Sequence, residues 1–353
     1  MMQGSSTTKR PITTEGDVDK RVFTIAPDGR KLLFARKLTV DSAAAFGNQL
    51  YLIADVGQPT QPVELVPNNV LYAEWIPGQD NTISYSTAEP RDANPGWLAY
   101  NDLQQMRIDP ATGSALSFKQ ILYRSASGLY SWWGTRFHWS SDGNALAWVQ
   151  ADGAGLVDLE NAKLGDPLVT FPVLRPVGDW SWRATVSWSP DNDLLLTTVH
   201  GAPVGSESAE NSPVFNIAAV NTQGLFSAPL VENAGIWAAP QFSPFVGGQS
   251  GQFPVSYIAY LKSRDPFNSI NGEYDLVVAD RDGSNERVIF PGAERPGIRA
   301  QQTIFINQEF TWSPDGRQIA LIYQGNLWIV DVESQISHQL TLDQGASNPV
   351  WVR

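Results

Sequence analysis

The chain of 353 residues contains no cysteine, so neither a disulfide framework nor a thiolate metal site can form. It also has no run of 18 or more apolar residues, and the sequence therefore predicts no membrane-spanning helix. Basic residues are few, because 24 Lys and Arg stand against 36 Asp and Glu, which gives a formal net charge of −12. This negative charge disfavours a nucleic-acid or anionic-membrane partner, since like charges repel.

Several signatures of catalysis and ligand binding are missing as well. No glycine-rich phosphate loop is followed by a helix pattern. The segment Gly248-Gln-Ser-Gly251 is one residue too short for the nucleophile elbow Gly-x-Ser-x-Gly. The segment Asp280-Arg-Asp-Gly283 lacks the alternating ligands and late glutamate of an EF-hand loop, and a turn explains it better. We therefore predict no catalytic residue, no cofactor and no metal.

One repeated unit is the main feature that the sequence does contain. Its clearest copy is Phe310-Thr-Trp-Ser-Pro-Asp-Gly316, followed by the apolar segment 319–323. Proline presets the first corner of a turn, Asp or Ser caps the turn through a side-chain oxygen, and glycine accepts the positive φ that follows. The unit thus predicts two antiparallel strands joined by a tight turn. Related copies start at residues 23, 73, 137, 186 and 240, and the partial copy Asn348-Pro-Val-Trp351 ends the sequence.

Most copies continue into a third and a fourth strand pattern, as in 327–331 followed by 338–341. Four short strands per unit, repeated roughly every 40 to 70 residues, are typical of a β-propeller blade. We predict an all-β, six-bladed propeller of four-stranded antiparallel blades, with the strand around Trp351 helping to close the ring. The predicted blades span 21–67, 70–122, 134–171, 183–232, 236–291 and 308–341. Residues 21–353 then form one propeller domain, after a flexible leader or stalk at 1–20.

The Trp-Ser-Pro-Asp-Gly turn, the following Ile-Ala-Leu and the later Leu-Trp-Ile-Val-Asp resemble the WD40-like (PD40) repeat of the TolB-type propellers. That family is similar in turn to the propeller domains of prolyl oligopeptidases, which carry an additional hydrolase domain. The resemblance covers roughly residues 21 to 353. It implies a protein-interaction role in the periplasm. The polar segment 1–20 also resembles the stalk of an exported protein or of a lipoprotein whose signal has been removed, so we expect the protein outside the cytoplasm: periplasmic, on the cell surface or secreted.

Long insertions are predicted mainly on one face of the ring. The chain enters each blade at its inner strand, so the Ser-Pro-Asp-Gly turns share one face, which we call the bottom. Loops between second and third strands, and those between blades, share the other face, which we call the top. The insertions at 37–48, 87–95, 200–213 and 262–273 belong to the top, and only the one at 245–254 belongs to the bottom. Insertions gathered on one face of a repeat protein often mark its binding surface.

Tryptophan usage also favours the top face. Several of the 13 tryptophans lie outside the strand patterns, in the connections into blades three, four and five. Their flat apolar rings, beside arginine donors, suit a sugar or a peptide. The predicted ligand-binding residues are Trp132, Trp133, Arg136, Trp180, Trp182, Arg183 and Trp237. The same tryptophans could instead pack between neighbouring blades, and the sequence leaves both interpretations open.

The sequence holds three histidines. His138 lies on an inner strand and is predicted to be structural, and His338 on an outer strand is predicted to be solvated. His200 opens a top insertion that also contains Glu207 and Glu210, a combination that permits a metal site but has no fixed spacing.

Three functions remain open on the sequence alone. The first is a non-enzymatic binding propeller of the cell envelope or exterior that recognises a protein, peptide or glycan on its top face. The second is a structural or assembly subunit of a larger complex. The third is a glycan lyase or hydrolase working in the central mouth, which would need several inward-facing acids or histidines.

Overall fold

The structure is a computed structural model that describes residues 10–14, 16–37, 48–67, 69–126, 128–175, 180–247, 254–300 and 310–351, and of Lys20 and Arg21 only the backbone. Strands make up almost all of the regular structure in these ranges. The helical segments are the single 3-10 turns η1 (Ser131–Trp133), η2 (Ala209–Asn211) and η3 (Pro266–Asn268). Within these ranges, no helix has the length and apolar character to cross a bilayer.

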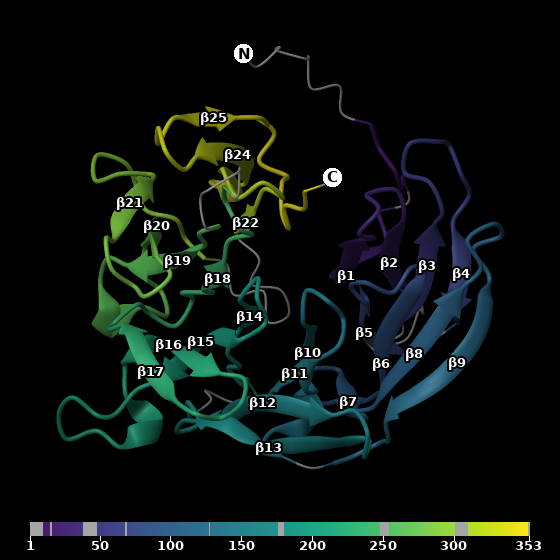
Figure 1. Ribbon diagram of the computed structural model, residues 1–353, viewed down its shortest axis with the longest axis horizontal. Coiled ribbons are helices and arrows are strands. Elements are labelled where there is room, and N and C mark those ends of the chain that lie inside the picture. Colours follow the sequence, from purple (N-terminus) through teal and green to yellow (C-terminus); the bar gives the residue numbers. More distant parts are fainter. Residues whose placement is uncertain are drawn as a thin grey trace.

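Six antiparallel sheets follow one another around a ring, each with its first strand nearest the centre (Figure 1). Blade one consists of β1 (Val18–Ile25), β2 (Leu32–Lys37), β3 (Asn48–Ile53) and β4 (Val63–Val66). Blade two consists of β5 (Val70–Trp75), β6 (Thr82–Pro90), β7 (Trp97–Ala99), β8 (Leu103–Ile108) and β9 (Ala115–Leu122). Blade three consists of β10 (Arg136–Trp139), β11 (Leu146–Val149), β12 (Gly153–Asp158) and β13 (Lys163–Thr170). Blade four consists of β14 (Val186–Trp188), β15 (Leu194–His200), β16 (Phe215–Asn221) and β17 (Ser227–Val231). Blade five consists of β18 (Gln241–Phe242), β19 (Tyr257–Ser263), β20 (Tyr274–Asp280) and β21 (Arg287–Phe290). Blade six consists of β22 (Phe310–Trp312), β23 (Gln318–Tyr323), β24 (Asn326–Asp331) and β25 (Ser337–Gln339).

The predicted fold is confirmed: the chain is an all-β, six-bladed propeller of four-stranded antiparallel blades. Two details differ from the prediction. Strand β1 begins at Val18, inside the segment predicted as a leader. The top insertion at 87–95 is part of a hairpin, because β6 runs on to Pro90 and pairs with the additional strand β7.

The repeated turn is held by one serine and one aspartate. In blade six, Ser313 Oγ donates to Asp315 Oδ1 at 2.6 Å and accepts the backbone N–H of Gln318 at 2.9 Å. Gly316 has a φ of 68°, a conformation that favours glycine. The same bonds recur between Ser140 and Asp142 and between Ser189 and Asp191. The buried serine therefore closes the turn, which explains why the motif repeats as Ser-x-Asp-Gly or Ser-x-Asp-Asn.

The hydrophobic core lies between neighbouring blades. In β20, Leu276 and Val278 belong to one buried cluster, whereas Val277 and Ala279 belong to another. Successive strand residues point to opposite faces of a sheet. Both faces of the blade are therefore buried, and each blade needs a neighbour on either side.

Inner-strand tryptophans join adjacent blades by a repeated hydrogen bond. The indole N–H of a tryptophan donates to a carbonyl at one fixed repeat position in the preceding blade. The pairs are Trp75 with Thr24 (3.4 Å), Trp188 with His138 (2.8 Å) and Trp351 with Thr311 (3.1 Å). Trp351 thus takes the place of the next blade's tryptophan, and the C-terminal segment runs from blade six toward blade one (Figure 1). Within the described residues Trp351 lies outside any strand, so the closing contact seen here is made by a side chain.

We expect Trp351→Ala to lower the free energy of unfolding by about 2 kcal/mol, because it removes a partly buried indole and its hydrogen bond at the junction after blade six. Urea unfolding measures the change. Leu342→Ala is the matched control, since Leu342 is 83% exposed and also lies after the last strand. Equal losses for the two variants would contradict a closing role for Trp351.

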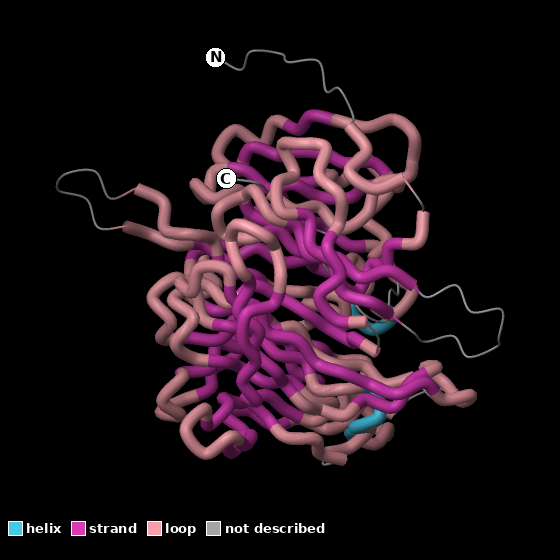
Figure 2. Tube along the Cα trace, turned by 90° about the vertical axis from the view of Figure 1, so that its right-hand side faces the viewer, coloured by secondary structure: helices cyan, strands magenta, loops and turns pink. Residues whose placement is uncertain are grey.

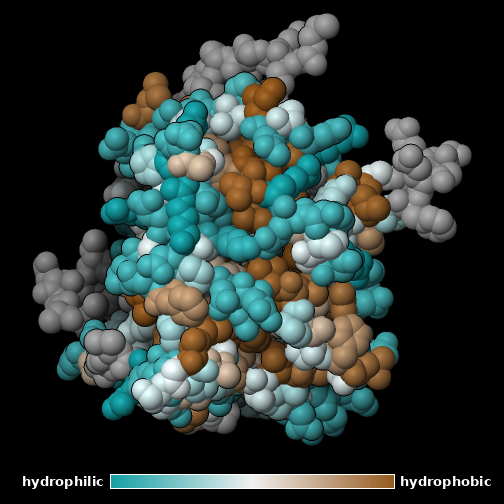
Figure 3. Space-filling model, turned by 90° about the vertical axis from the view of Figure 1, so that its left-hand side faces the viewer, coloured by the Kyte–Doolittle hydropathy of each residue, from teal (hydrophilic) through white to brown (hydrophobic). Residues whose placement is uncertain are grey.

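The two faces of the ring differ as the topology requires. Viewed from its edge, the molecule shows helical turns on one side of the strands (Figure 2). This is the top, since η1, η2 and η3 all lie in loops between blades or between second and third strands. The top insertion at 37–48 falls almost wholly outside the described residues. Leu225 in blade four and Val288 in blade five are exposed hydrophobic residues. On the edge formed by the later blades, hydrophobic and hydrophilic residues both reach the surface (Figure 3), as is usual for a protein.

Candidate functional site

The connection into blade three forms a rigid part of the top face. It contains η1, which lies against β7. Gly134 follows η1 with a φ of 93°, and a Cβ there would lie 2.8 Å from Leu71 Cδ2. Only glycine fits this position without displacing its neighbours.

The side chain of Asn101 ties this connection to blade two. Its Nδ2 donates to the carbonyls of Ser125 at 2.9 Å and Ser131 at 3.0 Å, and its Oδ1 accepts the backbone N–H of Thr135 at 2.8 Å. Asn101 is only 7% exposed, so these bonds are shielded from water. The loop that carries η1 is therefore fixed at several points.

A group of stacked aromatic and arginine side chains lies on this scaffold. We call it the rim cluster; it consists of Arg91, Tyr100, Arg124, Tyr130 and Trp132, all partly or fully exposed. The rings of Tyr130 and Trp132 meet edge to face with centroids 5.2 Å apart, and Arg91 Cζ lies 5.7 Å from the Trp132 ring. Arg124 Cζ lies 3.7 Å from the Tyr100 ring. Such surfaces offer both stacking faces and hydrogen-bond donors.

A second group lies on the inner strands of blades two and three and in the segment that leads into the inner strand of blade four. We call it the inner cluster; it consists of Tyr72, Glu74, Arg136, His138 and Arg183. In β5 the partly buried Tyr72 and Glu74 alternate with buried Ala73, and in β10 Arg136 and His138 flank buried Phe137. These four side chains therefore lie on the side opposite Ala73 and Phe137. The Tyr72 hydroxyl donates to the Phe137 carbonyl at 3.1 Å. Arg183, which is 6% exposed, donates from Nη1 to the carbonyls of Trp133 at 3.2 Å and Gly134.

The inner cluster is positively charged at neutral pH. Burial raises the pKa of Glu74 to about 8, although hydrogen bonds from Tyr72 and the Trp139 backbone oppose the shift. Burial, helped by the charge of Arg136, lowers the pKa of His138 to about 4. Burial also lowers the pKa of Arg136 to about 10 and that of Arg183 well below its ordinary value. Guanidinium groups keep their proton at pH 7, so Arg136 and Arg183 are charged, whereas the shifted pKa values of Glu74 and His138 make these two groups largely neutral.

Several buried polar atoms in this region have no hydrogen-bond partner within the described part of the chain. They are Glu74 Oε1, His138 Nε2, Ser181 Oγ, Arg183 Nε and Thr185 Oγ1. Ser181, Arg183 and Thr185 occupy alternate positions in the segment that leads into β14. Buried polar groups are normally satisfied, so such a concentration indicates a place for water or a ligand.

The structure separates the predicted ligand-binding residues into two sets. Trp133, Trp182 and Trp237 are 3%, 3% and 5% exposed. Each contacts other protein groups: Trp133 meets Trp97 with centroids 5.8 Å apart, and Trp237 Nε1 donates to the Ile270 carbonyl at 3.0 Å. These three indoles therefore pack within the protein.

The other predicted residues occupy more open positions or lie in the inner cluster. Trp132, Trp180 and Arg136 are partly exposed, whereas Arg183 is buried. Trp180 packs edge to face on Trp237 with centroids 6.1 Å apart. Contact of any of these residues with a ligand stays a prediction.

Tyr72 and Glu74 were not predicted from the sequence. A signal for Glu74 exists, because it occupies the repeat position that Thr24, His138 and Thr311 hold in other blades. An acid at that position is therefore unusual within this chain. The prediction that His138 is structural overlooked its neighbours, because blades two and four supply them from distant parts of the sequence.

The suggested metal ligands are not brought together. The ring nitrogens of His200 lie 3.0 Å from the Pro172 carbonyl and 2.6 Å from the Ser212 carbonyl. The Glu207 carboxylate instead accepts the backbone N–H groups of Val204 and Gly205. Over the residues that the structure covers, no three His, Asp or Glu side chains are grouped to hold a metal. The side chain of His338, on β25, is exposed, as predicted.

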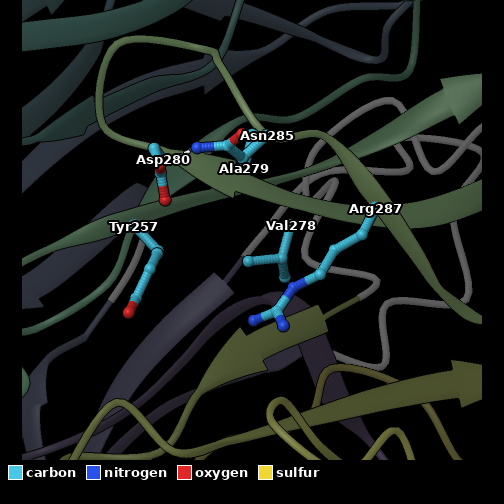
Figure 4. A pocket seen from close by; sticks show the side chains of 6 residues that line it. All are labelled: Tyr257, Val278, Ala279, Asp280, Asn285 and Arg287. Carbon is cyan, nitrogen blue, oxygen red and sulfur yellow. Dashed lines mark hydrogen bonds between the residues drawn. The ribbon is translucent and has the colours of Figure 1, made fainter.

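The bottom face carries a small open cavity of about 210 Å³ in blade five (Figure 4). Its polar lining includes Tyr257, Asp280 and Arg287, and Asn285 Nδ2 donates to Asp280 Oδ2 at 2.6 Å. Nearby, Arg281 forms a two-pronged ion pair with Asp191 of blade four, at 2.6 and 2.9 Å. The bottom turns therefore link neighbouring blades, and the segment 280–283 forms a turn as predicted, with the Gly283 N–H donating to the Asp280 carbonyl at 2.9 Å.

Comparisons with known proteins place the fold but no family. No family model matches the chain, and no curated protein matches it. A prolyl endopeptidase structure is 14% identical with a TM-score of 0.52, over 93% of this chain and 42% of that one. An acylaminoacyl peptidase from Pyrococcus horikoshii is 12% identical with a TM-score of 0.51, over 93% of this chain and 46% of that one. This chain thus spans less than half the length of either peptidase.

A putative TolB from Agrobacterium tumefaciens is 14% identical with a TM-score of 0.44, over 84% of this chain and 86% of that one. Identities this low concern the fold alone. By its own blade topology the chain is a six-bladed β-propeller, as the repeat predicted, and its repeat resembles that of the TolB-type propellers.

Proposed function

We propose that this propeller is a non-enzymatic binding protein that recognises a protein, peptide or glycan through the rim cluster on its top face. The observation that carries the proposal is the partly exposed stacking of Arg91, Tyr130 and Trp132 beside a loop fixed by Asn101. The proposal includes action outside the cytoplasm, which is supported by the resemblance of the repeat to TolB-type propellers.

A fixed aromatic surface lowers the cost of binding. Side chains that are already ordered lose little conformational entropy when a ligand arrives. Sugar and peptide groups can pack on flat rings beside guanidinium donors, and a ligand cation over an exposed ring gains about 0.5–1 kcal/mol. The rim cluster supplies several such contacts.

The inner cluster fits an enzyme less well. Glycoside hydrolysis commonly uses a pair of carboxylates with different protonation states. The inner cluster contains the single carboxyl group of Glu74, which is largely protonated at pH 7 because its pKa is about 8. Binding is therefore the function that this geometry supports best.

Peptide and glycan arrays test the proposal directly. We expect ligands found with the unmodified chain to bind at least tenfold more weakly to Trp132→Ala, because the stacking ring is lost. Arg91→Ala should weaken binding in the same direction. Phe245→Ala is the matched control, since Phe245 is an aromatic residue 40% exposed on the bottom face. Equal binding by all variants, or a loss confined to Phe245→Ala, would overturn the proposal. Arrays on which no ligand binds would also count against it and would favour an assembly subunit.

A further inference from the structure

We infer that the inner cluster binds a carboxylate carried by the ligand, with Arg183 as its principal partner and Arg136 beside it. This inference rests on the proposed function and names the chemical group that the top face would select. The carboxylate can belong to a peptide terminus or to an acidic sugar, and the experiment below separates these sources.

Arg183 is the first reason. Its side chain is 94% buried, and within the part of the chain that the structure describes its hydrogen bonds go only to the backbone carbonyls of Trp133 and Gly134. No carboxylate of the described residues forms an ion pair with it, and its Nε has no partner there. A buried charge without a counter-charge is strongly unfavourable, whereas a guanidinium binds a carboxylate through two parallel hydrogen bonds.

The surrounding charges are the second reason. The positive charge of Arg136 adds to that of Arg183 and lowers the pKa of Arg183 further. Glu74, His138 and Tyr72 are the other titratable groups of the inner cluster, and at pH 7 all three are largely neutral. A chain with a net charge of −12 therefore keeps a local positive site in the inner ends of blades two to four. An anion bound there would relieve the repulsion between the arginines.

The third reason is the set of neutral donors next to Arg183. Ser181 Oγ and Thr185 Oγ1 are buried without partners in the described chain, and they alternate with Arg183 along the segment into β14. Hydroxyl groups donate readily to carboxylate oxygens. The proposed site thus has a charged fork and two uncommitted donors, which is a suitable set for a group with two acceptor oxygens.

The chain itself connects this site to the rim cluster. Within η1, the side chain of Trp132 belongs to the rim cluster, and the carbonyl of the next residue, Trp133, holds Arg183. Arg136 follows shortly after and begins β10. The ring-stacking and carboxylate-binding groups therefore share one short segment, so one ligand can engage both.

Arginine Nε–H resonances of the full chain, recorded by NMR, test the inference. We expect sodium acetate to shift the Arg183 Nε signal saturably, whereas sodium chloride at the same ionic strength leaves it in place. N-acetylglycine should act at least tenfold more strongly than N-acetylglycinamide if a peptide terminus is selected. Galacturonic acid should act at least tenfold more strongly than galactose if an acidic sugar is selected. Thr185→Val should weaken the response without removing the arginine. In Arg183→Gln, where the Nε signal of Arg136 is the remaining reporter, the anionic probes should cause no saturable shift.

The outcomes separate this inference from the proposed function. If the Arg183 signal does not respond to any anion, buried water alone satisfies these atoms and the inference is wrong. If array ligands bind in a Trp132-dependent way but charged and neutral forms bind equally, the proposed function stands and the carboxylate site does not. If acetate binds at Arg183 while no array ligand is found, the inference stands and the proposed function fails.

Discussion

Replacing Trp182 by alanine is expected to lower the free energy of unfolding by about 4 kcal/mol, the typical cost of removing a fully buried tryptophan. The Trp182 side chain is 3% exposed. Its ring meets Phe215 edge to face with centroids 5.1 Å apart and Phe171 with centroids 5.8 Å apart. The large cavity left by the indole would be lined by these rings, which belong to a rigid interface and cannot close it.

Trp180→Ala is the matched control, because Trp180 lies two residues earlier and is partly exposed. We expect it to cost about half as much. Urea unfolding of both variants and the unmodified chain gives the comparison. If Trp182→Ala lost less than about 1 kcal/mol, its indole would not be a core side chain. That result would favour the interpretation of Trp182 as a ligand contact over its interpretation as a packing residue.

Glu74→Gln is expected to remove a pH dependence from the stability of the protein. The pKa of Glu74 is about 8 in the folded chain, against an ordinary value of 4.5. The folded state therefore holds a proton that the unfolded state releases between these values. The resulting stability is fully present below pH 4.5 and is lost as the pH rises through 8. Glutamine is neutral throughout, so the variant should not show this loss.

The measurable quantity is the difference in unfolding free energy between Glu74→Gln and the unmodified chain. It should grow by about 4 kcal/mol in favour of the variant between pH 5 and pH 8.5. His138 changes stability in the opposite sense, because its pKa is lowered to about 4 and its contribution is lost as the pH falls from 6.5 toward 4. It is present in both proteins, so its effect cancels in the difference. A difference that stayed constant with pH would show that Glu74 is ionised in the folded chain.

The parts of the fold that could be predicted are those fixed by local chemistry. Ser313, Asp315 and Gly316 form their turn within a few residues. Each copy of this turn motif in the sequence therefore predicts two strands, one on either side of it. The repeat position of Trp351 was also informative, since it correctly indicated a contact at the end of the ring. A strand there was not seen in the described residues, because repeat position alone does not supply a pairing partner.

The inner cluster could not be predicted because its members come from distant segments. Glu74, Arg136 and Arg183 meet only when blades two, three and four stand side by side. Burial of Trp182 depends in the same way on Phe171 and Phe215, which belong to other parts of the sequence. The sequence therefore indicated which residue types gather on the top face, but not which of them remain accessible.

Hydroxyl-radical footprinting, with and without a ligand selected on the arrays, tests most directly whether the top face of blades two to four is the recognition surface. The account predicts that the ligand protects Tyr130 and Trp132 from oxidation, while Phe245 and Tyr257 on the bottom face react equally in both states. Protection of Phe245 or Tyr257, with Tyr130 and Trp132 unchanged, would contradict it.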